Sequence, residues 1–276
     1  DVYANFGGVR LGMPPQRSML VMVHNIDWLN ELYENGHIES PDMPTTPEQF
    51  MDVACAAVEN PFSATLGDPE LAQGYSIYVD ASQAAGWIFA FGGDMYDYEN
   101  NVYIYDSPEV IAAMQFIADM FANGCAYSYG FREDQAAFGQ GLVLFAGNST
   151  SGLPYWKGDI AEGYDGQWSV GAFPHVGEEP ALDVYGASVS VGAGEPEEVL
   201  ASWLFVKYLT STDASAAWTE VSNYFPMRQS SADKLEEYFA SNEQFAAAFE
   251  LLPYGMFEPP VPGYDSVRRE FDSAMV

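Results

Sequence analysis

Short apolar runs that alternate with helix-start signals restrict the fold of this chain more than any other feature of its sequence. The run "SMLVMVHN" (18–25) has the length and the β-branched content of a buried strand. Two more runs, "QGLVLFAG" (140–147) and "DVYGASVSVG" (183–192), contain glycine at their boundaries and also resemble strands. Helical patterns lie between these runs, and strands that alternate with helices predict an α/β architecture.

Two of the helical patterns begin with the same local signal. In "TTPEQFMDVACAAVEN", Thr46 is placed as the N-cap, Pro47 lies in the first turn and Gln49 completes a capping box. In "DSPEVIAAMQFIADMFANG", a serine cap is likewise followed by proline, and a glycine ends the pattern. The sequence therefore predicts helices that begin near residues 47 and 108.

The stretch "ASWLFVKYLTSTDASAAWTEVSNYFPMR" (201–228) contains two consecutive helical patterns and then an aromatic loop closed by Pro226 and Arg228. Apolar residues recur at helical spacing in both patterns, including Trp203 in the first and Trp218 in the second. We predict two helices here, over residues 197–209 and 214–222.

Charge excludes one class of partner. The 276 residues include 40 acidic and 9 basic side chains, for a formal net charge of −31, and such a field repels nucleic acid. A solvated surface suited to secretion and an adaptation to high salt both explain this acidity; lysine occurs only at Lys157, Lys207 and Lys234. With 48% hydrophobic residues the chain can form a packed core, yet no run of about 18 apolar residues predicts a membrane span. The chain opens like the interior of a domain, so we expect either a removed leader or a fragment.

Sites for metals and for catalysis have little support in the sequence. The three histidines are scattered and the two cysteines form no CxxC motif, so we expect no metal and no cofactor. Cys55 and Cys125 could form one disulfide in an exported protein or remain two separate buried thiols. The segment "GNSTSG" (147–152) lacks the glycine spacing of a nucleophile elbow, and phosphate-binding glycine motifs are absent. "GDMYDYENN" (93–101) lacks the spacing of a calcium loop and is interpreted as an acidic turn.

Six segments, taken in order, resemble the family 1 extracellular solute-binding proteins of ABC importers, the maltose-binding-protein-like group. "LGMPPQRSMLVMVHNIDWL" is similar to the segment where that family's chain first crosses between its lobes, and "MPTTPEQF" to its "P.TWdEf", with Thr46 in place of tryptophan. "FGGDMYDYENNVYIYDSPEVIAAMQFIADMFANG", "FGQGLVLFAGNS" and "VGAFPHVG" follow in the family's order. The stretch that begins "PEEVLASWLFVKYLTS" then resembles the family's lobe-returning helix pair, with Pro226 and Arg228 at the next crossover.

The resemblance implies a two-lobed periplasmic-binding-protein-like fold of type II, with one lobe nearly complete and the other partial. Residues 1–18 would end the N-terminal lobe and form the first crossover. Residues 19–183 and 227–276 would form the C-terminal lobe, and residues 184–226 would return to the N-terminal lobe. Family members carry further residues before "VRLGMPP" and after "FDSAMV", so we expect this chain to be truncated at both ends and to leave apolar faces of helices 197–209 and 214–222 uncovered.

The resemblance also implies a function without catalysis: capture of a mono- or oligosaccharide between the lobes and its delivery to the membrane subunits of an ABC importer. The full-length protein would be an extracellular or periplasmic monomer, anchored as a lipoprotein, with no nucleic acid as partner. Two alternatives stay open. A surface-attached binding or assembly protein would reuse the fold without a transport ligand, and a secreted glycan hydrolase would turn over oligosaccharides.

Candidate ligand-binding residues follow from where crossovers and strand ends converge in such folds. The first crossover supplies Gln16, Arg17 and Ser18, although Arg17 could instead form an ion pair that bridges the lobes. The loop "YVDASQ" supplies Asp80, Ser82 and Gln83, although Asp80 or Ser82 could simply cap a helix. The remaining candidates are Asn148, Ser149, Ser151 and Trp156 after the strand at 140–147, Ser188 and Tyr224 at the other crossovers, and Tyr264 beside a Pro-Gly turn. Tyr264 is the leading aromatic candidate for stacking on a sugar, with Trp156 next.

Overall fold

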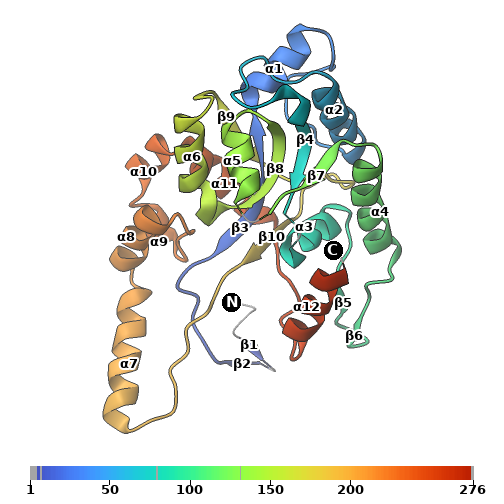
Figure 1. Ribbon diagram of the computed structural model, residues 1–276. Coiled ribbons are helices and arrows are strands. Elements are labelled where there is room, and N and C mark those ends of the chain that lie inside the picture. The colour runs from blue at the N-terminus through green and yellow to red at the C-terminus, as the bar shows by residue number, and fades with distance from the viewer. Residues whose placement is uncertain (1–4, 7, 79, 131, 275–276) are drawn as a thin grey trace.

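The central feature of the computed structural model is a seven-stranded sheet with the order β11-β10-β3-β8-β4-β7, in which β9 also pairs with β3 (Figure 1). The structure describes residues 5–6, 8–78, 80–130 and 132–274. The strands of this sheet are β3 (Ser18–Asn25), β4 (Gln73–Ile77), β7 (Ala126–Ser128), β8 (Val143–Ser149), β9 (Trp168–Gly171), β10 (Leu182–Tyr185) and β11 (Gly255–Met256). Two short hairpins lie outside it: β1 (Asn5–Phe6) with β2 (Val9–Arg10), and β5 (Tyr96–Asp97) with β6 (Val102–Tyr103).

Helices cover both faces of the sheet, which confirms the predicted α/β class (Figure 1). One face of the sheet is covered by α1 (Ile26–Glu34), α2 (Pro47–Glu59), α3 (Ala81–Ala90) and α4 (Pro108–Ala122). On the other side lie α5 (Glu133–Gly139), α6 (Leu153–Glu162), α10 (Glu236–Ser241) and α11 (Glu243–Glu250). The remaining helices are α7 (Pro196–Leu209), α8 (Thr212–Ser222), α9 (Gln229–Ala232) and α12 (Tyr264–Ala274). In the described part of the chain, no helix combines the length and the apolar character that crossing a membrane requires.

Strand β3 shows how one sequence run builds two cores. Successive side chains of a strand point to opposite faces of its sheet. Accordingly, Leu20 and Met22 join the apolar cluster formed with α1 to α4. Met19, Val21 and Val23 join the second cluster, which includes residues of α5, α6 and α11. The run 18–25 was predicted as a buried strand, and all eight of its residues are buried.

The predicted helix starts are confirmed at Thr46 and Ser107. The Thr46 hydroxyl accepts a hydrogen bond from the Gln49 amide at 3.3 Å, and the Ser107 hydroxyl accepts one from the Val110 amide at 3.4 Å. Proline occupies the first turn of both helices, where its missing N–H costs nothing.

A disulfide bond joins Cys55 of α2 to Cys125, which follows α4 and precedes β7. The bond links residues 70 positions apart and lies at the edge of the first apolar cluster. Of the two arrangements left open by the sequence, the structure shows the disulfide.

Two segments connect the sheet side of the molecule with the projecting helices α7 and α8, which lie at the lower left of Figure 1, and a third connects the β1–β2 hairpin with β3. Met13 and Val189 exchange backbone hydrogen bonds of 2.8 and 2.9 Å, and the Phe225 amide donates to the Arg17 carbonyl at 2.8 Å. The segment near residue 13 therefore pairs with the one near 189, and the segment near residue 17 pairs with the one near 225.

Strand β10 ends two residues beyond position 183. Val184 and Tyr185, which we assigned to the other lobe, pair with Met19 and Ser18 as the end of β10. The apolar pattern of 183–192 continues past the sheet edge, and only the backbone pairing shows that the chain leaves the sheet at Gly186. The division of the remaining residues between lobes stays a prediction.

Helices α7 and α8 expose large apolar side chains. In α7 only Val206 is buried, whereas Trp203 is 48% exposed and Phe205 is 62% exposed. In α8, Trp218 is 41% exposed and Val221 is 78% exposed. These helices thus present an apolar face that the described residues leave uncovered.

Candidate ligand-binding pocket

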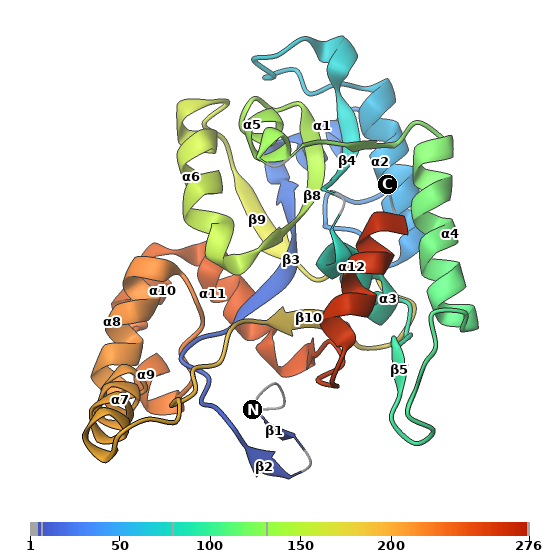
Figure 2. The ribbon, with the colours of Figure 1, turned by 60° about the horizontal axis from the view of Figure 1, so that its bottom comes forward.

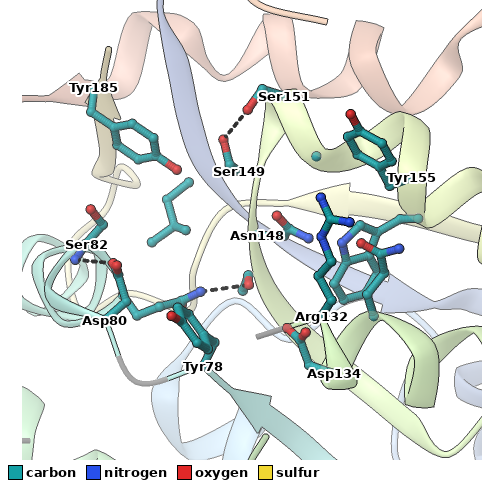
Figure 3. A pocket seen from close by; sticks show the side chains of 16 residues that line it. Tyr78, Asp80, Ser82, Arg132, Asp134, Asn148, Ser149, Ser151, Tyr155 and Tyr185 are labelled. Atoms are coloured by element: carbon teal, nitrogen blue, oxygen red, sulfur yellow. Dashed lines mark hydrogen bonds between the residues drawn. The ribbon is translucent and has the colours of Figure 1, made fainter. Parts of the chain in front are cut away.

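A cavity of about 390 Å³ opens beyond the carboxyl ends of β4 and β8 (Figure 3). Because β4 and β8 are parallel, their carboxyl ends meet at one edge of the sheet, where ligands bind in open α/β folds. We call this cavity the main pocket. It is lined by Leu20, Tyr78, Asp80, Ser82, Gln83, Arg132, Asp134, Gln135, Gly147, Asn148, Ser149, Ser151, Gly152, Tyr155, Trp156 and Tyr185.

One wall of the main pocket comes from the start of α3. Asp80 is the N-cap, and its carboxylate accepts a hydrogen bond from the Ser82 amide at 2.7 Å. Helix capping, the alternative considered for Asp80, is thus present, yet the residue also lines the pocket. The Gln83 amide nitrogen donates to the Gly147 carbonyl at 2.7 Å, while its buried oxygen has no partner among the described residues.

Gly147 allows this close approach of α3 to β8. A Cβ atom at position 147 would lie 2.2 Å from the Gln83 side-chain oxygen, which is too close for any real contact. The glycine at the end of the "LVLFAG" run therefore fixes where the Gln83 amide group lies.

The opposite wall carries charge and an exposed aromatic ring. Arg132 precedes α5 with φ of 66°, a left-handed conformation that is uncommon for a side chain of this size. Its guanidinium lies 5.4 Å from the centre of the Tyr155 ring, within range of a cation–π interaction. Asp134 is 7% exposed, and burial raises its pKa above the ordinary value. Figure 3 shows Arg132 and Tyr155 across the pocket from Asp80 and Tyr78.

A chain of hydroxyl groups forms the base of the pocket. The Ser18 hydroxyl lies 2.5 Å from that of Ser149 and 3.0 Å from that of Thr150, and Ser149 lies 2.9 Å from Ser151. Burial raises the Tyr185 pKa above its ordinary value. Ser18 is 1% exposed, so it supports Ser149 and Ser151 from below and does not line the pocket.

The crossover candidates hold the connection together and do not line the main pocket. Arg17 is 4% exposed and donates to the Gln16 carbonyl at 2.8 Å, the Ala187 carbonyl at 2.9 Å and the Ser188 hydroxyl at 3.1 Å. These bonds join Arg17 to the segment at 187–188. The alternative considered for Arg17, an ion pair that bridges the lobes, stays a prediction. The Gln16 side chain accepts a hydrogen bond from the Trp218 indole.

Tyr224 is the last of the crossover candidates, and it does not line the main pocket either. It lies in the crossover beside Phe225, partly buried and outside the main pocket. Its backbone amide donates to the Ser222 hydroxyl at 3.4 Å. The structure therefore separates the four crossover candidates Gln16, Arg17, Ser188 and Tyr224 from the pocket.

The two aromatic candidates differ from expectation. Trp156 is 1% exposed and packs on Phe138 with ring centres 5.1 Å apart, so its ring offers no open face for stacking. The helical period explains this position, because α6 turns Trp156 toward the core and its neighbour Tyr155 outward, 60% exposed. Tyr155 is the aromatic residue that this segment presents at the pocket.

Tyr264 lies in a second, smaller cavity of about 250 Å³, which we call the side pocket. It is lined by Ser82, Tyr185, Gly186, Glu258, Tyr264 and Arg268. Because Ser82 and Tyr185 line both cavities, the side pocket adjoins the main pocket.

A charged cluster surrounds the side pocket. Glu258 is 5% exposed and accepts hydrogen bonds from the Tyr264 hydroxyl at 2.5 Å and from Arg268 at 2.9 Å. Asp183 lies fully buried on β10, and burial together with the charge of Glu258 raises its pKa well above the ordinary value. Burial and the neighbouring negative charge both disfavour the ionised form of Asp183.

Six polar or aromatic pocket residues were missed by the sequence analysis: Tyr78, Arg132, Asp134, Gln135, Tyr155 and Tyr185. Arg132 and Asp134 follow β7, a strand of three residues that is too short to show a periodic signal. Tyr185 lay inside a run interpreted as a strand, and the missing signal was the end of that strand at Gly186. Seven predicted residues do line the pocket: Asp80, Ser82, Gln83, Asn148, Ser149, Ser151 and Trp156.

The main pocket offers both polar and aromatic contacts to a ligand. Its walls offer amides, hydroxyls and carboxylates that pair with ligand hydroxyls, and Tyr155 offers an apolar ring face. Among the described residues, no three histidine, cysteine or acidic side chains gather in a group that could hold a metal ion.

Comparison with solved structures shows the same fold in bacterial binding proteins. UgpB from Mycobacterium tuberculosis, solved with glycerophosphocholine, matches with a TM-score of 0.81 at 17% identity, over 99% of this chain and 66% of that one. The sugar-binding protein MalE from Xanthomonas citri matches with a TM-score of 0.80 at 17% identity, over 99% and 67%. The GacH receptor of Streptomyces glaucescens, solved with acarbose, matches with a TM-score of 0.78 at 20% identity, over 99% and 66%. The chain thus spans about two thirds of the length of these neighbours.

Sequence comparison assigns the family. No curated protein sequence matches the chain. A model of the bacterial extracellular solute-binding proteins matches residues 1–251, which is most of its length. This match agrees with the periplasmic-binding-protein-like fold and with a pocket suited to a small polar ligand. The chain belongs to the bacterial extracellular solute-binding protein family, whose members bind solutes and do not catalyse their conversion.

Proposed function

We propose that the main pocket binds a carbohydrate and that the full-length protein delivers it to the membrane subunits of an ABC importer. The observation that carries the proposal is the lining of the pocket: Asp80, Gln83 and Asn148 offer hydrogen-bonding groups, and Tyr155 lies across from Asp80 (Figure 3). A sugar has hydroxyls around its rim and apolar C–H faces, so it can use both kinds of group at once.

The solved neighbours support this ligand class. A Thermotoga maritima protein is solved with maltose, one from Thermotoga lettingae with tagatose and one from Agrobacterium radiobacter with ribitol. These three ligands are uncharged and rich in hydroxyls, whereas the glycerophosphocholine bound by UgpB carries charged groups beside its hydroxyls. The net charge of −31 further disfavours an anionic solute, which the field of the protein would repel.

The paired crossovers supply the mechanical part of the proposal. Backbone bonds between Met13 and Val189, and between Arg17 and Phe225, connect the segments on which two lobes would turn. A solute that contacts both lobes stabilises the closed form by the difference in its affinity for the two forms, and the importer would recognise that closed form. We further propose that the full-length protein is monomeric and anchored as a lipoprotein at the cell surface or in the periplasm.

A thermal-shift screen of the full-length protein against mono-, di- and oligosaccharides and polyols tests this function. A ligand that binds only the folded state at 100 times its Kd raises stability by about 2.7 kcal/mol. The Tyr155→Ala variant should weaken binding of the best ligand about tenfold without lowering the melting temperature, because the ring is 60% exposed. Tyr127→Ala is the matched control, since Tyr127 is 52% exposed and does not line the pocket. A full screen without any shift would favour a binding or assembly protein that has no transport ligand.

A further inference from the structure

The β5–β6 hairpin is an aromatic feature that the main pocket does not use. It lies beside α12, at the lower right of Figure 2, and contains the acidic turn "GDMYDYENN". Tyr103 of β6 stacks on Tyr264 of the side pocket, with ring centres 6.4 Å apart and planes 19° apart. Tyr96 lies 5.1 Å from Tyr103, and Tyr98 lies 5.2 Å from Tyr96, both with edge-to-face geometry. A continuous row of tyrosine rings therefore runs from the side pocket along the hairpin.

The acidic side chains of this turn shape the loop. One Asp97 carboxylate oxygen accepts hydrogen bonds from the Glu99 and Asn100 amides at 2.9 and 3.0 Å, and the other accepts one from the Asn100 side chain at 2.6 Å. These bonds hold the Asp97 pKa below its ordinary value. Asp97 is thus engaged within the loop. The turn fixes the hairpin on which the tyrosines lie.

Two side chains of the row, Tyr98 and Tyr103, have groups that a ligand can contact. At the outer end, Tyr98 is 51% exposed, so part of its ring is open to solvent. Nearer the pocket, the buried Tyr103 hydroxyl has no hydrogen-bond partner among the described residues. An exposed ring face and an unpaired hydroxyl are complementary to the two chemical sides of a sugar.

The row is also continuous with the proposed site. The side pocket shares Ser82 and Tyr185 with the main pocket and ends at Tyr264, on which Tyr103 stacks. A ligand that is too long for the main pocket would extend past the side pocket and along the polar and aromatic side chains of the row. The acidic groups beside the row, Asp94 and Glu99, disfavour a glycan that carries carboxylates or sulfates.

We propose that Tyr96, Tyr98 and Tyr103 form an outer carbohydrate subsite that binds the distal units of an uncharged oligosaccharide whose first units occupy the main pocket. This proposal rests on the proposed function and adds a size class to it. The protein would bind linear oligosaccharides more tightly than the corresponding disaccharide, and the gain would depend on the hairpin.

Isothermal titration of the full-length protein with malto-, cello-, xylo- and manno-oligosaccharides, each from the disaccharide to the hexasaccharide, tests the subsite. In the series that binds, affinity should rise about tenfold or more with length. Tyr98→Ala should remove most of that rise and leave disaccharide affinity unchanged, whereas Tyr98→Phe should retain it, because the ring face makes the contact. Tyr33→Ala is the matched control: Tyr33 is 47% exposed on α1, at the opposite end of the molecule (Figure 1).

The outcomes separate the two proposals. Affinity that does not change with length, or a length-dependent gain that survives Tyr98→Ala, would overturn the outer subsite and leave sugar binding in place. The same holds if only monosaccharides or polyols bind in the thermal-shift screen. If no sugar or polyol binds at all, both proposals fail together.

Discussion

Reduction of the Cys55–Cys125 bond should lower the free energy of unfolding by about 2–4 kcal/mol. The two residues are 70 positions apart, and closing a loop of that length removes enough unfolded-state entropy to stabilise the protein by about 4 kcal/mol at 25 °C. We expect less than this upper value, because the unfolded chain keeps some residual structure. The bond ties α2 to the segment that leads into the edge strand β7, so its loss should loosen that side of the sheet first.

Urea unfolding of the oxidised and the reduced protein measures this difference in the free energy of unfolding without changing any residue. The double variant Cys55→Ala with Cys125→Ala serves as the control, because its unfolding curve should be insensitive to reductant. A thiol titration of the untreated, denatured protein should find no free thiol. Two reactive thiols, or identical curves with and without reductant, would refute the reasoning.

Two further predictions concern acid stability and self-association. Burial lowers the pKa of His24 from 6.5 to about 4, so the unfolded state binds the proton more tightly, and stability should fall by about 3 kcal/mol as the pH drops from 6.5 toward 4. In urea titrations His24→Gln should lack this part of the acid loss; a constant difference from the wild type at pH 7 and pH 4.5 would contradict the assignment. The 276-residue chain made alone should associate through Trp203, Phe205 and the other exposed apolar residues of α7 and α8, and Phe205→Lys should reduce that association. Light scattering after size-exclusion chromatography measures it, and a monodisperse wild-type monomer would count against an uncovered face.

The elements that sequence predicted well are those with local causes. Thr46 and Ser107 begin helices because a side-chain oxygen, a proline and the apolar period all lie within one turn. The run 18–25 forms β3 with the predicted bounds. A strand that is buried on both faces is apolar along its whole length, so it can be identified without knowing which strands pair with it. The strand expected at 183–192 was shorter, since its end depends on where β3 stops offering backbone partners.

The residues of the main pocket were harder to predict from sequence than the helices and strands, because several of them meet only in the tertiary structure. Asp80, Ser82 and Gln83 were predicted because a helix start after a strand end presents polar groups in this class of fold. Arg132 and Tyr185 come from segments more than 50 residues apart and meet only when the strands are in register. The choice between Tyr155 and Trp156 depended on the rotation of α6, which packing against Phe138 decides.

The central claim is that the main pocket binds the solute, and calorimetric titration of the best ligand from the screen into the wild type and Asn148→Ala tests it most directly. Asn148 lies on β8 within the pocket, partly buried, where a ligand hydroxyl can pair with its amide group. The loss of such a buried hydrogen bond should weaken binding about tenfold or more, with the melting temperature of the free protein unchanged. Equal affinity in the wild type and the folded variant would contradict the placement of the solute in this pocket.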